Sequence, residues 1–301
     1  MKQYGLLIIL TMMQVTSVDA QRVYSDNPPK GKVYTYKTSN GIAREMEIYF
    51  PKDHDASKKT VPGIILFHGG GWGGGSRVMF SYQCNYFASR GLVAATVTYR
   101  LVTKAEKSSM KGNPSHKRIG TTDAKSAIRW FKQHAKELGV DPKRIIAGGG
   151  SAGGHISSLA ALNTNTTLDD PADSADPKDY DTSVAALVLF NPAYTASNED
   201  TEVHLQQHLK PDFPPTIAFY GSEDNWMKKG FNPAYEKMKS LGIKSVKVQI
   251  ADGQGHGFFN QQPWADITLI AADKFLNQLG LIEGEPTLPA PANGEKLVER
   301  P

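Results

Sequence analysis

The sequence predicts an α/β protein, with a mostly parallel, doubly wound sheet opened by an antiparallel hairpin. Apolar runs such as "VPGIILF" and "VAALVLF" are hydrophobic throughout, which is typical of strands covered on both faces. Segments with helical spacing separate these runs, and such alternation favours helices on both sides of a parallel sheet. With 301 residues, 40% of them hydrophobic, the chain can form a sizeable core.

The first half of the chain begins with the hairpin. Two strands are expected within residues 31–51, joined by a turn at Ser39-Asn40-Gly41. A strand within 61–71, a helix within 81–91 and a strand within 92–100 follow. The clearest helix spans residues 121–139, because apolar residues recur on one face and Gly139 provides a stop.

The second half continues the alternation. Strands are expected in 144–150, 184–193, 214–225 and 245–258, and helices in 151–162, 232–242 and 262–280. Together these elements predict one doubly wound domain between about residues 30 and 282. Residues 101–118 and 197–213 fit this core poorly, and the second segment is expected to form a small cap. Both follow strand ends, where open α/β sheets place ligand sites.

The two ends of the chain predict export and a disordered tail. Residues 1–20 have the pattern of a signal peptide, with Lys2, an apolar stretch at 5–13, and Val18-Asp19-Ala20 as the cleavage site. This stretch is shorter than the roughly 20 residues that span a bilayer, so we expect no stable membrane insertion. The mature catalytic domain would then cover 21–282, and the Pro-rich segment 283–301 is expected to be disordered. The protein is therefore expected in the periplasm or outside the cell.

Charge and cysteine content narrow the classes of partner. The formal net charge is +4, and no run of Lys or Arg stands out, so we expect no nucleic-acid partner. Cys84 is the only cysteine and has no partner for an internal disulfide. Stability would then depend on the core.

A cluster of glycines surrounds Ser151, and it fits two kinds of site. "GGGSAG" at 148–153 matches a dinucleotide-binding pattern, as does "GGGWGG" at 69–74. Such a site also needs a carboxylate about 20 residues further on, at the end of the next strand. Asp169 and Asp170 instead lie in a predicted loop, and the second motif has no carboxylate at that distance. We therefore expect no nucleotide cofactor.

The same residues match G-x-S-x-G, in which a serine is exposed on a sharp turn from strand to helix. The motif alone could be a glycine-rich connection. Three further features favour a nucleophile: "HGGGW" at 68–72 ends an earlier strand, Asp224 follows a later strand, and His256 lies in the next glycine-rich loop. The order Ser151, Asp224, His256 is that of α/β-hydrolases.

The chain resembles the α/β-hydrolase-fold carboxylesterases, in particular the hormone-sensitive-lipase-like and feruloyl-esterase-like groups. The resemblance rests on "HGGGW", "GxSAGGH" and "GHGF", and "VTYRL" also fits. It covers nearly the whole of residues 30–282. One departure is Gly150, where the first group usually has an acidic residue. With His155, it favours the feruloyl-esterase-like group, whose members are often exported and act on plant-type polysaccharides.

The motifs assign roles to six residues. Ser151 is the expected nucleophile, His256 its general base and acid, and Asp224 the residue that orients the imidazole, with Glu223 and Asp252 as alternatives nearby. The amide of Ala152 is expected to bind the oxyanion. The resemblance adds Gly70 and Gly71 to that oxyanion hole.

Other histidines are expected to have structural roles. His68 is expected to order the glycine loop, and His155 to be structural. "HLQQH", with His204 and His208, has a spacing that could bind zinc, but it lacks the metalloprotease glutamate and an evident third ligand. We therefore expect neither a metal site nor a cofactor.

The predicted function is a secreted serine carboxylesterase for short-acyl or carbohydrate-linked esters, acetyl or feruloyl. The alternatives are a serine peptidase of the prolyl-oligopeptidase type, and a catalytically idle binding protein on the same scaffold. The peptidases usually carry a large extra domain, for which this chain has no room.

Overall fold

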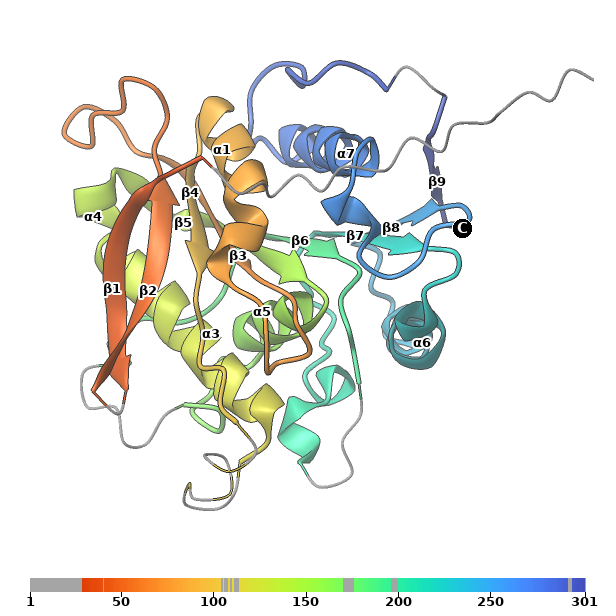
Figure 1. Ribbon diagram of the computed structural model, residues 1–301, viewed down its shortest axis with the longest axis horizontal. Coiled ribbons are helices and arrows are strands. Elements are labelled where there is room, and N and C mark those ends of the chain that lie inside the picture. The colour runs from red at the N-terminus through yellow and green to blue at the C-terminus, as the bar shows by residue number, and fades with distance from the viewer. Residues whose placement is uncertain are drawn as a thin grey trace, which may run out of the picture.

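The strands of the computed structural model form one twisted sheet (Figure 1). The structure describes residues 29–300, except 40, 104, 106, 107, 109, 111–113, 170–175, 196–199, 292 and 293. Within these residues the sheet has nine strands in the order β1-β2-β4-β3-β5-β6-β7-β8-β9. Their bounds are β1 Lys32–Ser39, β2 Ile42–Tyr49, β3 Val61–Phe67, β4 Val93–Val97, β5 Val140–Gly150, β6 Ala186–Phe190, β7 Thr216–Gly221, β8 Val246–Ala251 and β9 Leu297–Glu299.

The strand directions confirm the predicted fold class. The strands from β4 through β3 to β8 pair in parallel, whereas β1, β2 and β9 pair antiparallel with their neighbours. Strands β3, β6 and β7 are buried along their whole length. This burial explains why their sequences are apolar without alternation.

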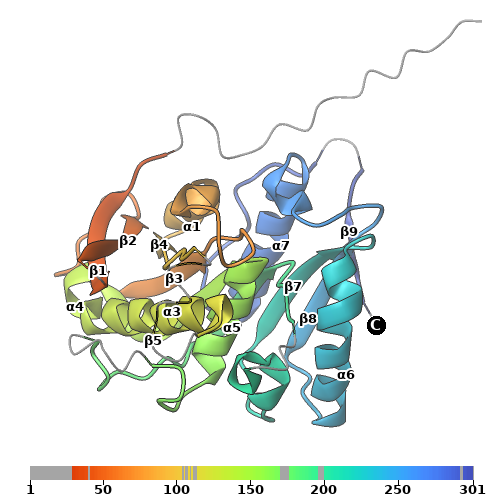
Figure 2. The same cartoon turned by 60° about the horizontal axis from the view of Figure 1, so that its bottom comes forward.

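Helices cover both faces of the sheet (Figure 2). Their bounds are α1 Ser81–Ser89, α3 His116–Gln133, α4 Ala135–Leu138, α5 Ala152–Leu162, α6 Asn232–Ser240 and α7 Trp264–Gln278. Apolar residues of α1 and α7 belong to one buried cluster, and those of α3, α5 and α6 to the other. Cys84 of α1 is fully buried, and this burial raises the pKa of its thiol.

Helix α3 begins five residues before its predicted start at residue 121. The hydroxyl of Ser115 caps it by accepting a hydrogen bond from the Arg118 amide at 3.1 Å. Two cations of this helix, Lys125 and Arg129, are buried against the carboxylate of Asp169, at 2.7 and 3.0 Å. In the first turn, Arg118 pairs with Asp200 at 2.7 Å. Such a polar contact with a distant segment carries no apolar period, so the sequence pattern did not reveal the start of the helix.

The C-terminal segment differs from the prediction of a disordered tail. Residues 297–299 form β9, which pairs with β8 in the register Ile250 with Val298. The guanidinium of Arg90 also donates to the carbonyl oxygens of Glu283 and Gly284, at 2.9 and 3.0 Å. These backbone partners lie far away in the sequence, and for that reason composition alone gave the wrong expectation for this part of the tail.

The expected cap is represented by two short 3₁₀ turns, at Thr201–Val203 and Leu205–Gln207. They lie against α5, because the ring of His155 donates from Nε2 to the Val203 carbonyl at 3.0 Å. The predicted signal peptide lies outside the described residues. In the described part of the chain, no helix combines the length and apolarity needed to cross a membrane.

A buried carboxylate joins α1 to α7 and gives the first prediction. Asp273 of α7 accepts hydrogen bonds from Tyr86 of α1 and from Arg90, which follows α1 directly, at 2.5 and 2.6 Å. Asp273→Ala would leave buried polar groups without this acceptor, so we expect the free energy of unfolding to fall by about 3 kcal/mol. Glu236→Ala, which removes an exposed partner of Lys239, should cost about 0.5 kcal/mol or less. Urea unfolding measures both, and equal effects would contradict this assignment.

Candidate active site

Ser151 lies at a sharp turn between β5 and α5, with backbone angles φ 50° and ψ −115°. Its amide donates to the Phe190 carbonyl at 2.9 Å, and its own carbonyl accepts from Ala193 at 3.0 Å. Both partners belong to the end of β6 and the chain that follows it. The neighbouring strand therefore holds the serine in a conformation that non-glycine residues rarely adopt.

Glycines are required beside this turn, because other backbone comes very close to it. A Cβ atom on Gly149 or on Gly153 would overlap the carbonyl oxygen of Phe67, the last residue of β3. At Gly150 a Cβ atom would lie 2.6 Å from Cζ of the Phe259 ring. Phe259 therefore fills the space that a side chain at position 150 would need, at the point where the sequence departs from the hormone-sensitive-lipase-like pattern.

The structure brings Ser151, His256 and Asp224 together. The Ser151 hydroxyl donates to Nε2 of His256 at 2.8 Å, and Nδ1 of His256 donates to Oδ2 of Asp224 at 2.8 Å. The Asp224 carboxylate is fully buried, and the imidazole is about one-third exposed. The other carboxylate oxygen accepts from the Trp226 amide at 2.8 Å, so the acid has a fixed orientation. Of the acidic residues considered from the sequence, Asp224 is the one bonded to this histidine.

The glycine loop after β3 forms one side of the same site. Gly70 and Gly71 line a cavity with Ser151, and neither amide donates a hydrogen bond within the described residues. Ala152 is the first residue of α5, so its amide has no carbonyl partner within the helix. These three predicted oxyanion-hole residues therefore surround the serine with amides that a negatively charged oxygen could use.

His68 and Tyr99 support the glycine loop from below. Their rings stack with centroids 4.3 Å apart, and Nδ1 of His68 donates to the Gly69 carbonyl at 2.7 Å. The Tyr99 hydroxyl donates to the His68 carbonyl at 3.1 Å. This arrangement fits the expectation that His68 orders the loop.

The cavity above Ser151 has a volume of about 290 Å³. Its walls include the rings of Trp72 and Trp226, whose centroids are 6.5 Å apart. Trp72 is held at its other edge by His155, with ring centroids 5.5 Å apart. The cavity thus combines an aromatic wall with a small number of polar groups, as small-molecule sites commonly do.

Sequence reasoning missed two polar residues of this cavity, Asn191 and Asn260, of which Asn191 contacts the histidine. Asn191 follows β6 directly and its side chain contacts the imidazole of His256. The available signal was its position, because a polar residue at the end of an apolar parallel strand lies at the edge of the sheet where ligands bind.

The comparison with known proteins identifies the family. A family model described as BD-FAE matches residues 46–208. The chain belongs to the BD-FAE family. This result confirms the resemblance seen in the sequence.

Two curated relatives from Mycobacterium tuberculosis are named as ester hydrolases. The chain is 32% identical over 304 residues to the probable carboxylic ester hydrolase LipM, covering 90% of this chain and 66% of LipM. It is 26% identical over 234 residues to the esterase LipC, covering 68% of this chain and 55% of LipC. This BD-FAE chain thus spans between about half and two thirds of the length of these relatives.

The solved structures that are similar include esterase 2 of Thermogutta terrifontis. Its apo form has 32% sequence identity and a TM-score of 0.72, and the match covers 86% of this chain and 98% of that one. A propionate-bound structure of the same esterase has 33% identity and a TM-score of 0.73, covering 85% and 97%. These matches show that the BD-FAE chain has the α/β-hydrolase fold.

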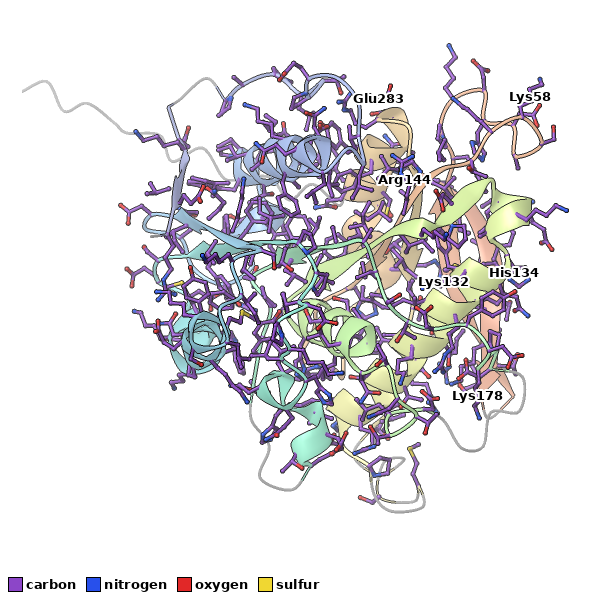
Figure 3. The ribbon with its side chains drawn as sticks, turned by 180° about the vertical axis from the view of Figure 1, so that it is seen from behind. Lys58, Lys132, His134, Arg144, Lys178 and Glu283 are labelled. Carbon is purple, nitrogen blue, oxygen red and sulfur yellow. The ribbon has the colours of Figure 1, made fainter. Side chains whose placement is uncertain are left out.

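Two other places in the described residues, a second hollow and the "HLQQH" segment considered from the sequence, lack the features of an active site. A hollow of about 430 Å³ lies at the opposite end of the strands, beside Lys132, which is labelled in Figure 3. Lys132 forms an ion pair with Asp181 there, at 2.6 Å. In the "HLQQH" segment, His208 donates to the Glu202 carbonyl at 2.7 Å, and the described residues contain no group of three metal ligands.

Two buried histidines predict a stability that depends on pH. Burial lowers the pKa of His68 to about 4 and that of His155 to about 3, from 6.5. Between each lowered pKa and 6.5, the unfolded chain binds more protons than the folded protein does. The free energy of unfolding is therefore highest above pH 6.5 and decreases as the pH falls toward 4. Each histidine should account for roughly 2–3 kcal/mol between pH 6.5 and 4.5. Urea unfolding across this range should show a smaller loss in His155→Leu, whereas an equal loss would contradict the assignment.

Proposed function

We propose that the protein is an exported serine carboxylic-ester hydrolase that acts through Ser151, His256 and Asp224. The observation that carries the proposal is the continuous hydrogen-bonded chain from the serine hydroxyl through the imidazole to the buried carboxylate. The names of the relatives support the same reaction class.

The first half of the reaction acylates the serine. Oγ of Ser151 attacks the ester carbonyl carbon while Nε2 of His256 accepts the hydroxyl proton. The imidazolium that forms is stabilised by Asp224, which keeps Nδ1 protonated and Nε2 facing the serine. When the tetrahedral intermediate collapses, the proton passes from Nε2 to the departing alcohol.

The glycine loop and the start of α5 stabilise the charge that develops on the carbonyl oxygen. The amides of Gly70, Gly71 and Ala152 would donate to this oxyanion, and such a donor lowers the barrier by about 2.7–4 kcal/mol. In the second half, water attacks the acyl-enzyme with His256 again as the base. The acid product leaves and the serine is regenerated.

The cavity favours small acyl groups and an aromatic or sugar-like alcohol. The cavity has a volume of about 290 Å³, and Phe259 and Met79 are among the residues that line it. These side chains limit the room for a long acyl chain. Trp226 is 37% exposed beside the cavity and can stack on a ring of the substrate. Acetyl esters of carbohydrates fit these properties, whereas the larger feruloyl group would have to extend out of the cavity along the exposed Trp226 ring. The N-terminal pattern of a signal peptide supports a substrate outside the cytoplasm.

The nucleophile is tested by replacing it. Ser151→Ala should lower kcat on p-nitrophenyl acetate by about 10⁶-fold, because the acyl-enzyme can no longer form. Ser157→Ala serves as a matched control in helix α5, which follows Ser151, since the Ser157 hydroxyl donates to the Gly154 carbonyl at 3.1 Å. A fluorophosphonate should label the wild type and the control, and leave Ser151→Ala unlabelled.

Other outcomes of that experiment point to the alternative functions. Activity that survives in Ser151→Ala would overturn the proposed mechanism. A wild type inactive on esters but active on a prolyl p-nitroanilide would favour the peptidase. If neither substrate is turned over and the fluorophosphonate does not label Ser151, the scaffold serves as a binding protein.

The cavity size is tested with a series of esters. The purified wild type should show its highest kcat/KM on p-nitrophenyl acetate or butyrate. The octanoate should have a kcat/KM at least roughly tenfold lower, because poor accommodation of the longer acyl chain need raise the barrier by only about 1.4 kcal/mol to have this effect. Methyl ferulate and an acetylated xylo-oligosaccharide then compare the two natural ester types. A preference for octanoate would contradict the assignment of a small acyl pocket.

A further inference from the structure

Asn191 is placed beside the catalytic histidine by a strained backbone. It is completely buried and has a φ of 40°, a conformation that asparagine tolerates better than most residues. Its backbone amide donates to the Phe219 carbonyl of the neighbouring strand β7 at 2.7 Å. Strand β7 also leads into the turn that carries Asp224, so the same strand fixes both residues.

The Asn191 side chain contacts both nitrogens of the imidazole. Its Nδ2 atom lies 2.8 Å from Nδ1 and 3.2 Å from Nε2 of His256. The ring carbon Cε1 lies between these two nitrogens. If Nδ2 of Asn191 were in the plane of the ring at these distances, it would overlap Cε1. The amide therefore lies above the ring plane.

The two ring nitrogens already have partners within their plane. Nδ1 bonds Asp224 and Nε2 bonds Ser151, each at 2.8 Å. Neither nitrogen has a second in-plane hydrogen or lone pair for the amide. The contact with Asn191 is therefore a dipole placed over the ring, whose energy depends on the charge of the imidazole.

The other end of that side-chain amide lacks a partner among the described residues in this orientation. With Nδ2 over the ring, Oδ1 is buried and has no hydrogen-bond partner within the described residues. The two ends of a primary amide have nearly the same size, so half a turn exchanges them without moving other atoms. After this turn the oxygen lies over the ring, and its partial negative charge attracts an imidazolium.

We propose that Asn191 is a positioning residue that presents its amide oxygen to the face of His256 and favours the imidazolium form. This inference rests on the proposed function, in which His256 gains a proton as Ser151 attacks. An interaction that strengthens as the ring becomes charged stabilises the transition state more than the ground state. Asn191 thereby supplements Asp224 from a second direction.

A single charged side chain among the described residues is paired with the His256 ring. Within the described residues, Asp224 is the charged side chain in ion-pair contact with His256, from the turn after β7. The further neighbours are the Ser151 hydroxyl and the Trp226 ring, whose centroid is 6.3 Å away. A change at Asn191 should therefore be readable in the titration of the histidine.

The experiment follows the ring proton signal of His256 by NMR across pH, together with the pH profile of kcat/KM. The signal is assigned by its loss in His256→Gln. Asn191→Asp keeps the shape and adds a negative charge, so the titration midpoint should rise by about one unit or more. Asn191→Gly permits the positive φ and removes the amide, so the midpoint should fall by several tenths of a unit. The acidic limb of kcat/KM should shift by the same amounts.

A matched control is Asn260→Asp, which adds a charge at another asparagine of the cavity, one that donates to the Gly257 carbonyl at 3.1 Å. Its shift should be less than half of that in Asn191→Asp. An unchanged midpoint in Asn191→Asp would overturn the inference, because it would indicate a purely packing role for Asn191. A rise of the midpoint in Asn191→Gly would also overturn it, because that is the result expected if an amide hydrogen lies over the ring. The NMR titration does not require turnover, so it remains informative if the esterase proposal fails.

Discussion

The close contact between the end of β3 and the turn after β5 determines the geometry of the whole site. The carbonyl oxygen of Phe67 occupies the space that a side chain at Gly149 or Gly153 would need. Phe67 and Gly149 are also paired in the sheet, so the two strands end at the same level. This contact places the glycine loop after β3 directly beside Ser151. Any larger residue at either glycine would separate the loop from the serine and open the proposed oxyanion hole.

Backbone strain is concentrated around the same contact. Of the four non-glycine residues with positive φ in the described chain, three line the cavity: Trp72, Ser151 and Asn191. They follow β3, β5 and β6, three neighbouring strands of the sheet. A residue in such a conformation costs of order 1–3 kcal/mol and persists only where its surroundings determine it. Here the buried C-terminal ends of these strands impose the conformations, and the strain holds three side chains in fixed directions over one small volume.

The features that sequence could predict depend on local rules. The glycine pattern around Ser151, the strand-end positions of Asp224 and His256, and the alternation of apolar runs all lie within short segments. The features it missed depend on partners distant in the chain. The start of α3 is held by the ion pair of Arg118 with Asp200, the tail is ordered by β8, and Asn191 acquires its position only when β6 lies beside β7. The roles of the site residues stay predictions until activity is measured.

The two outer strands bear on how the protein avoids self-association. An exposed sheet edge offers unpaired backbone groups to a second chain, and natural proteins limit this with short edge strands and bulges. At one edge β1 carries an irregularity between Thr35 and Lys37, and at the other β9 is three residues long. By covering β8, the C-terminal segment replaces a six-residue parallel edge with this short one. The tail, which composition predicts to be disordered, thus leaves a shorter exposed edge on this side of the sheet.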